Sequence, residues 1–325
     1  MAMIQDNNFP VPYETSYVKT DDEHELYMEQ IGNPEGIPII FLHGGPGSGC
    51  QIHHRNLFNL DSSRIIFLDQ RGAGKSLPKR SLTNNTTSYL IKDIELIRKK
   101  LNIKKWIVVG GSWGSTLGIA YAEEYSQYVN GLILRSIFLG TKDEIEWAFT
   151  NAAKLFRPEI WDSWKNLAIT EDASMIPINF YGSKLESEDK FVSEVAAHVW
   201  SNYESILSQI ESTENKIPKS FYDKHFNNSS IKPNTPYFEW HYIKNKFFLE
   251  DDKLLNNAHK LNGIPGTIIQ GRYDLLCPPV NAFNLAEIWK DSKLLLVEEG
   301  GHSANSGPMR EALTGAISKL ITKLL

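Results

Sequence analysis

A serine enclosed by glycines is the feature of this sequence best suited to covalent chemistry. Ser112 lies in the sequence GGSWG at residues 110–114, between an apolar segment at 106–109 and a helical pattern that begins near Ser115. A serine hydroxyl is a weak nucleophile at neutral pH, so enzymes that use it place it on a sharp strand-to-helix turn within reach of a base. The flanking glycines leave room for strand and helix to approach each other. The sequence therefore predicts that Ser112 is a nucleophile.

A candidate base and a candidate acid occur later in the chain. Asp274 follows the apolar segment 266–270 within the sequence GRYD, and His302 follows the segment 294–297 within GGHS. An imidazole can take the proton of a serine hydroxyl, and a carboxylate can fix the tautomer of that imidazole. The order serine, acid, histidine is the one expected when the serine lies on a strand-to-helix turn. We therefore predict a triad of Ser112, His302 and Asp274. The alternatives are that His302 is a surface loop histidine and that Asp274 is a turn-capping carboxylate.

A glycine-rich segment, HGGPG at 43–47, follows the apolar segment 37–42. Enzymes of this kind place one half of an oxyanion hole there, because glycine lets the main chain approach a tetrahedral intermediate closely. We assign the two donors to the backbone N–H groups of Gly45 and Trp113. The alternative is a Gly-Pro turn that binds nothing. Phosphate binding is excluded, since the chain has no GxxxxGK[ST] and no GxGxxG that opens a helix after a strand.

The elements that must position these residues alternate between strand and helix. Alternating apolar residues near Tyr17–Thr20 and Glu25–Ile31 indicate an antiparallel start to a sheet. The expected later strands are 37–42, 65–68, 106–109, 131–134, 266–270 and 294–297, and the expected helices include 88–101 and 309–324. This alternation implies a mostly parallel sheet with helices on both faces.

The pattern changes between residues 138 and 261, where helical segments rich in aromatic residues replace the alternation. A helical block inserted between two sheet strands is most simply a cap over the carboxyl edge of the sheet, where ligands of open α/β sheets bind. We therefore expect a core domain of residues 1–137 and 262–325 and a cap domain of residues 138–261.

Composition narrows the functional classes. The chain has 325 residues, is 41% hydrophobic and carries a formal net charge of −5 with scattered Lys and Arg, which indicates neither a nucleic-acid nor a membrane surface. No segment reaches the length of a transmembrane helix, and residues 1–8 lack the features of a signal peptide. Cys50 and Cys277 form no CxxC pair, and no compact metal-ligand motif occurs. We expect a cytoplasmic protein without metal or other cofactor.

Five segments taken together resemble the proline iminopeptidases, also called prolyl aminopeptidases. They are HGGPG at 43–47, DQRGAGKS at 69–76, GGSWGSTL at 110–117, GRYD at 271–274 and GGHS at 300–303. Their order and approximate spacing match the family from about Tyr13 to the C-terminus. The resemblance implies an α/β-hydrolase fold, with a mostly parallel central sheet and an inserted helical cap. It also implies a serine peptidase that removes N-terminal proline from peptides without a metal.

The resemblance also implies roles for two cap glutamates. Family members hold the free amine of the substrate with two glutamates, and the matching positions are Glu204 in WSNYE and Glu239 in FEWHY. Residue type alone would make both solvated helix residues. A prolyl ammonium has two N–H donors, and two carboxylates can accept one each. For the wall around the proline ring, position favours Phe138, Phe149 and Cys277, with a plain core role as the alternative.

Two other functions stay open at this stage. A general esterase or amidase would share the triad but have an unrelated acyl pocket, and a non-catalytic receptor of the same fold would have no need of all three triad residues. Epoxide hydrolases and dehalogenases are disfavoured, because both carry an aspartate where this chain has Ser112. The sequence leaves open the oligomeric state, the preferred peptide length and the tolerance of hydroxyproline.

Overall fold

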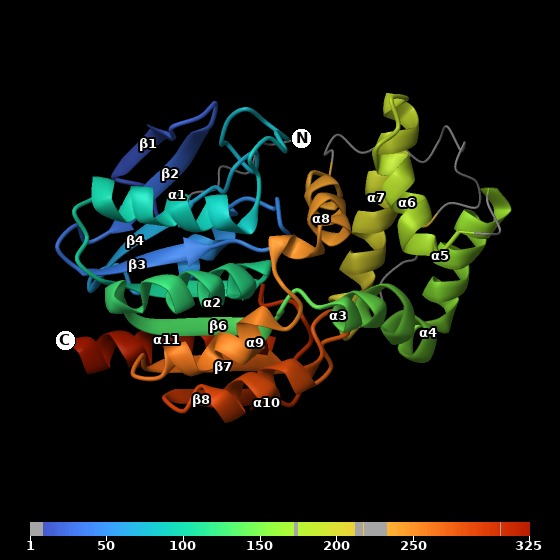
Figure 1. Ribbon diagram of the computed structural model, residues 1–325. Coiled ribbons are helices and arrows are strands. Elements are labelled where there is room, and N and C mark those ends of the chain that lie inside the picture. Colours follow the sequence, from blue (N-terminus) through green and yellow to red (C-terminus); the bar gives the residue numbers. More distant parts are fainter. Residues whose placement is uncertain (1–8, 172–174, 212–216, 218–232, 306) are drawn as a thin grey trace, which may run out of the picture.

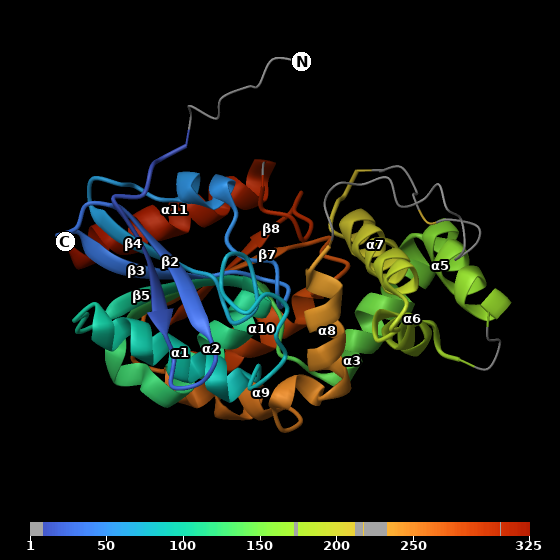
Figure 2. The ribbon, with the colours of Figure 1, turned by 90° about the horizontal axis from the view of Figure 1, so that it is seen from above.

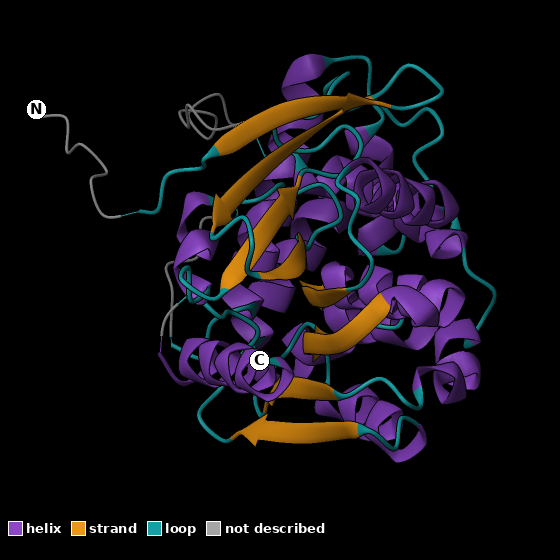
Figure 3. Ribbon diagram, turned by 90° about the vertical axis from the view of Figure 1, so that its left-hand side faces the viewer, coloured by secondary structure: helices purple, strands orange, loops and turns teal. Residues whose placement is uncertain are grey.

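One twisted sheet organises the computed structural model, which describes residues 9–171, 175–211, 217, 233–305 and 307–325. In the described residues its strand order is β1-β2-β4-β3-β5-β6-β7-β8 (Figures 1 and 3). Strands β3 to β8 run parallel, while β1 pairs with β2, and β2 with β4, in the antiparallel sense. The predicted α/β-hydrolase fold is therefore confirmed.

The strands form where the apolar runs predicted them, with ends that differ by a few residues. Their bounds are β1 Glu14–Lys19, β2 Glu25–Gly32, β3 Ile37–Leu42, β4 Ser63–Leu68, β5 Trp106–Ser112, β6 Val129–Ile137, β7 Gly266–Gly271 and β8 Ser292–Val297. The central strands are buried on both faces, which explains their continuous apolar sequences. Strand β5 continues without a loop into the next helix, so that helix begins at Trp113, two residues before the predicted start.

Helices cover both faces of the sheet. One face carries α1 (Thr87–Lys100), α2 (Trp113–Tyr125), α9 (Lys253–Asn257) and α10 (Pro279–Ile288) over one large buried apolar cluster. The other face carries the 3-10 helix η1 (Ile52–Leu57) and α11 (Gly307–Leu324), which share a second buried cluster with Phe41. Because strands β3 to β8 are parallel, they all end at one edge of the sheet, and the loops there lie side by side.

A group of helices projects beyond that edge (Figure 2). It comprises α3 (Lys142–Glu146), a π-helix (Trp147–Asn151), α4 (Ala152–Phe156), α5 (Pro158–Glu171), α6 (Pro177–Leu185), α7 (Lys190–Leu207) and α8 (Thr235–Lys244). The described residues between 138 and 261 include no strand. The cap has its own aromatic core, in which Trp164 stacks on Tyr181 with ring centroids 3.7 Å apart. The helical insertion thus packs around its own cluster.

The exact division of the chain into two domains stays a prediction. Residues 172–174, 212–216 and 218–232 of the predicted cap lie outside the described residues. At the other end of the cap, Phe247, Leu254 and Leu261 pack in the cluster beside helix α2. By packing, the last part of the predicted cap segment thus belongs with the sheet.

Residues 1–8, on which the expectation of no signal peptide depends, also lie outside the described residues. Among those that the structure describes, no helix has both the length and the apolar character needed to cross a membrane.

Candidate active site

Ser112 lies on a strained turn at the end of strand β5. Its backbone has φ 56° and ψ −128°, a conformation that residues other than glycine rarely adopt. The neighbouring glycines make this turn possible: a Cβ on Gly110 would lie 2.2 Å from the carbonyl oxygen of Gly114, and a Cβ on Gly114 would lie 2.2 Å from that of Leu42. The Ser115 hydroxyl donates to the Ser112 carbonyl at 2.7 Å. This geometry is that of a nucleophile elbow.

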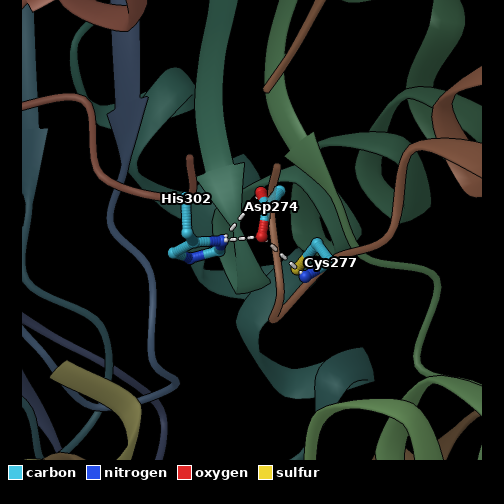
Figure 4. Close-up of side chains that lie close together, drawn as sticks. All are labelled: Asp274, Cys277 and His302. Carbon is cyan, nitrogen blue, oxygen red and sulfur yellow. Dashed lines mark hydrogen bonds and ion pairs between the residues drawn. The ribbon is translucent and has the colours of Figure 1, made fainter. Parts of the chain in front are cut away.

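Asp274 and His302 form a hydrogen-bonded pair (Figure 4). His302 Nδ1 lies 3.0 Å from both carboxylate oxygens of Asp274. The carboxylate is buried and accepts the backbone N–H groups of Leu276 at 3.1 Å and Cys277 at 2.8 Å. Burial raises the pKa of Asp274, but the facing His302 and the hydrogen bonds to the carboxylate together hold this pKa below its ordinary value. An ionised Asp274 orients the ring so that Nδ1 carries the proton, and Nε2 can accept one.

The loop that carries His302 is held by two contacts that the sequence analysis missed. Arg135 Nη1 donates to the His302 carbonyl at 2.6 Å, and the Ser303 N–H donates to the carbonyl of Ser208 at 3.1 Å. Arg135 lies on strand β6, whereas Ser208 follows cap helix α7. The position of His302 therefore depends on both the sheet and the cap. The position of Arg135 directly after the predicted strand 131–134 is a weak sequence signal for a site residue. The sequence around Ser208 gives no such signal.

A glutamine links the two segments that carry the predicted oxyanion donors. Gln70 Nε2 donates to the His43 carbonyl at 2.9 Å, and Gln70 Oε1 accepts the indole N–H of Trp113, also at 2.9 Å. Gly45 has φ +105°, and Trp113 is the first residue of helix α2. Gln70 belongs to the DQRG sequence, whose role the motif alone did not reveal. Through these two hydrogen bonds, Gln70 fixes the glycine-rich segment 43–47 relative to the start of helix α2.

A cavity of about 530 Å³ opens above Ser112. Ser112, His302 and Gly45 line it from the sheet, and Glu204 and Glu239 line it from the cap. The three residues predicted for the proline pocket, Phe138, Phe149 and Cys277, line it as well. Asp274, which pairs with His302, and Trp113 are buried and do not line the cavity. Except for Asp274 and Trp113, the predicted site residues thus line one cavity, although they come from elements far apart in sequence.

The two cap glutamates differ from the solvated residues that their type alone suggests. Glu239, on helix α8, is 8% exposed, and Glu204, on helix α7, is partly buried. Burial raises the pKa of Glu204 to about 7. Burial and the neighbouring Glu204 carboxylate raise the pKa of Glu239 well above its ordinary value. Glu239 Oε2 has no hydrogen-bond partner among the described residues. Such a pair favours a bound cation that would compensate both charges.

Apolar side chains complete the cavity beside this pair. The ring of Phe138 contacts Phe247 edge to face at 5.0 Å, and Phe149 stacks on Tyr203 at 5.9 Å. Burial raises the pKa of the Cys277 thiol well above its ordinary value. Cys277 is therefore a neutral, small wall residue rather than a thiolate.

Cys277, Asp274 and His302 have potential metal-ligand atoms that all lie within 4.8 Å of one another. Their chemistry fits a metal poorly, because Asp274 and His302 already pair with each other and the thiol keeps its proton.

Comparison with known proteins gives the same fold and a specific family. Residues 37–306 match the family model described as alpha/beta hydrolase fold. The chain is 39% identical over 310 residues to a proline iminopeptidase of Arabidopsis thaliana, covering 95% of this chain and 80% of that one. It is 38% identical over 317 residues to a proline iminopeptidase of Neisseria gonorrhoeae, covering 97% and 98%.

A solved structure, that of proline iminopeptidase from Mycobacterium smegmatis, superposes with a TM-score of 0.64 at 15% identity, covering 96% of this chain and all of that one. At this identity the similarity shows the fold alone. The sequence relatives are much closer and nearly full-length. The chain therefore belongs to the proline iminopeptidase family of the alpha/beta hydrolase fold.

Proposed function

We propose that this protein is a serine aminopeptidase that releases N-terminal proline from peptides. The names of its relatives support this function, and one structural observation carries it: Glu204 and Glu239 pair within the same cavity as Ser112. A substrate with a free secondary ammonium matches this pair, because its two N–H donors can each meet one carboxylate. A substrate without an amine would leave two buried carboxyl groups uncompensated.

The proposed reaction proceeds through an acyl-enzyme. Ser112 Oγ attacks the first peptide carbonyl while His302 takes its proton, and Asp274 stabilises the imidazolium that forms. The N–H groups of Gly45 and Trp113 stabilise the oxyanion. His302 then passes the proton to the leaving amine, and water attacks the prolyl ester by the reverse sequence. Proline leaves with a free carboxylate, and Ser112 regains its proton.

The substrate range follows from the distance between amine and carbonyl. With the ammonium at the glutamate pair and the carbonyl at Ser112, only the first peptide bond lies in reach, so the enzyme is an exopeptidase. Phe138, Phe149 and Cys277 are the proposed wall of the proline ring. We further propose that the segment 138–261 forms the cap, except for its last part, which packs with the sheet. We also propose a cytoplasmic location, where the thiols of Cys50 and Cys277 stay reduced.

A set of arylamides tests this function. The purified protein is assayed with prolyl-, alanyl- and leucyl-arylamides and with N-acetylprolyl-arylamide. We expect the prolyl compound to have the highest kcat/KM and the acetylated compound, which has no ammonium, to be inert. Equal hydrolysis of the free and acetylated prolyl compounds would favour the esterase or amidase function. No hydrolysis of any substrate, together with no labelling by a fluorophosphonate, would favour a non-catalytic receptor.

A further inference from the structure

The cavity above Ser112 has a second part that the proline pocket does not use. The side chains that line it come from strand β3, helix η1, the loop after His302 and helix α11, and Ser208 at the end of cap helix α7 contacts that loop. We call this part the sheet-side lobe. The lining residues that matter here are Phe41, His53, His54, Leu57, Ala304, Asn305 and Leu313. The lobe therefore lies toward the sheet face that η1 and α11 cover, whereas Glu204 and Glu239 come from cap helices α7 and α8.

The floor of the sheet-side lobe is apolar. Phe41, Leu57 and Leu313 belong to the buried cluster between the sheet and helix α11, and Ala304 packs against that cluster. These side chains are held from several elements, so the floor is preformed. An apolar group that entered the lobe would cover this surface and exclude water from it.

The polar side chains of the lobe are neutral. His54 Nδ1 accepts the backbone N–H of Gln51 at 3.0 Å, its ring lies 4.7 Å from that of Phe41, and burial lowers its pKa to about 3. Burial also lowers the pKa of His53, which interacts with Asn305 at the rim. Among the described residues that line the lobe, none carries a carboxylate, and the nearby Arg135 brings a positive charge to the cavity. This chemistry suits an apolar group and opposes a basic one.

The reaction geometry points the leaving group into this lobe. In the proposed reaction the prolyl amine lies at the glutamate pair and its carbonyl at Ser112, so the chain beyond the scissile bond extends from Ser112 away from the glutamates. His302 must reach the leaving nitrogen to protonate it. The residues that follow His302, including Ala304 and Asn305, are lobe residues. A side chain on the residue after proline would therefore lie against them.

We propose that the sheet-side lobe binds the side chain of the residue that follows the N-terminal proline, and that it selects an apolar side chain there. This inference rests on the proposed function. It adds a second point of specificity to the glutamate pair, which reads only the amine. Peptides that begin Pro-Leu or Pro-Phe are then better substrates than those that begin Pro-Gly or Pro-Lys.

The first test measures kcat/KM for the tripeptides Pro-Xaa-Gly with Xaa as Gly, Leu, Phe or Lys, with prolinamide as a substrate that lacks the second residue. Filling an apolar pocket typically changes kcat/KM by about 10- to 200-fold. We expect Leu and Phe to exceed Gly by about tenfold or more, and Lys to be no better than Gly. Cleavage of all four peptides at one kcat/KM would overturn the subsite but leave the proposed function standing. Cleavage of none would overturn both.

A matched pair of variants locates the effect. Ala304→Phe fills the sheet-side lobe, and Ala148→Phe places the same side chain in the cap-side part of the cavity. We expect Ala304→Phe to lower the ratio of kcat/KM for Pro-Leu-Gly to that for prolinamide by about tenfold. Ala148→Phe should lower both values together. Leu313→Ala, which removes part of the floor, should also lower the ratio and guards against a folding defect in Ala304→Phe. An unchanged ratio in both lobe variants would place the subsite elsewhere.

Discussion

The cap carboxylates that we propose as the binding site of the substrate amine should destabilise the free protein when they ionise, and Glu204→Gln should reveal this effect. Burial raises the pKa of Glu204 from an ordinary 4.5 to about 7. The neutral form therefore favours folding, and this stabilisation is present below pH 4.5 and lost as the pH rises through about 7. Glutamine keeps the shape of the side chain and never ionises, so the variant should not lose this stability.

The size of the effect follows from the pKa. A rise from 4.5 to about 7 corresponds to about 3 kcal/mol at about 1.36 kcal/mol per pH unit. Because Glu204 is only partly buried, solvent screens its charge, and we expect about 1–3 kcal/mol. About 2–4 °C of thermal midpoint accompanies each kcal/mol in proteins somewhat smaller than this one. The thermal midpoint of Glu204→Gln minus that of wild type should thus be a few degrees larger at pH 8 than at pH 4.5.

Thermal unfolding of both proteins at a series of pH values provides the assay. Glu159→Gln, which changes an exposed glutamate of cap helix α5, serves as the control and should follow wild type. Free proline should raise the midpoint of wild type at pH 8 and have less effect on Glu204→Gln, since the amine loses one partner. If Glu204→Gln and wild type depend on pH in the same way, Glu204 does not titrate near neutrality and the reasoning is wrong.

Three further predictions concern the elbow and the triad. Ser112→Ala should lose about 10⁴-fold or more in kcat and all labelling by a fluorophosphonate; turnover close to wild type would remove Ser112 from the mechanism. Asp274→Asn should lower kcat by about 10⁴-fold while substrate still binds, because the His302 tautomer is no longer fixed; a small effect would contradict the assigned pair. Gly114→Ala should unfold more readily in urea by about 1–3 kcal/mol, because its Cβ would meet the Leu42 carbonyl at 2.2 Å, and unchanged stability would contradict a tight elbow.

The sequence predicted the sheet well because its strands are continuous apolar runs. Strand β3 has the predicted bounds, and the other strands differ by a few residues at their ends. Ends are less predictable because polar and glycine residues there take their conformation from neighbours. Ser112 shows this: it closes strand β5 with φ 56°, a conformation that depends on Gly114 and Leu42 packing behind it.

Some residues of the candidate site could likewise be predicted from the sequence, and others could not. The sequence could place Ser112, Asp274 and His302 together because each lies at or shortly after the end of a strand, and parallel strands end at one edge. The two glutamates were assigned from the family resemblance alone, since residue type predicts exposure for both. They are buried because cap helices α7 and α8 place both side chains in the wall of the cavity. The support of His302 by Arg135 and Ser208 comes from tertiary packing, for which local sequence gives almost no sign.

The central claim is that the glutamate pair makes a serine hydrolase into a proline aminopeptidase, and Glu239→Gln tests it most directly. The variant is assayed with a prolyl-arylamide and with p-nitrophenyl acetate, which needs only the triad and the oxyanion hole. Loss of a buried charge-assisted contact should cost about 2–4 kcal/mol, so the ratio of the two kcat/KM values should fall by about 30- to 1000-fold. An equal loss on both substrates, or no loss on either, would contradict the role of Glu239 as an amine anchor.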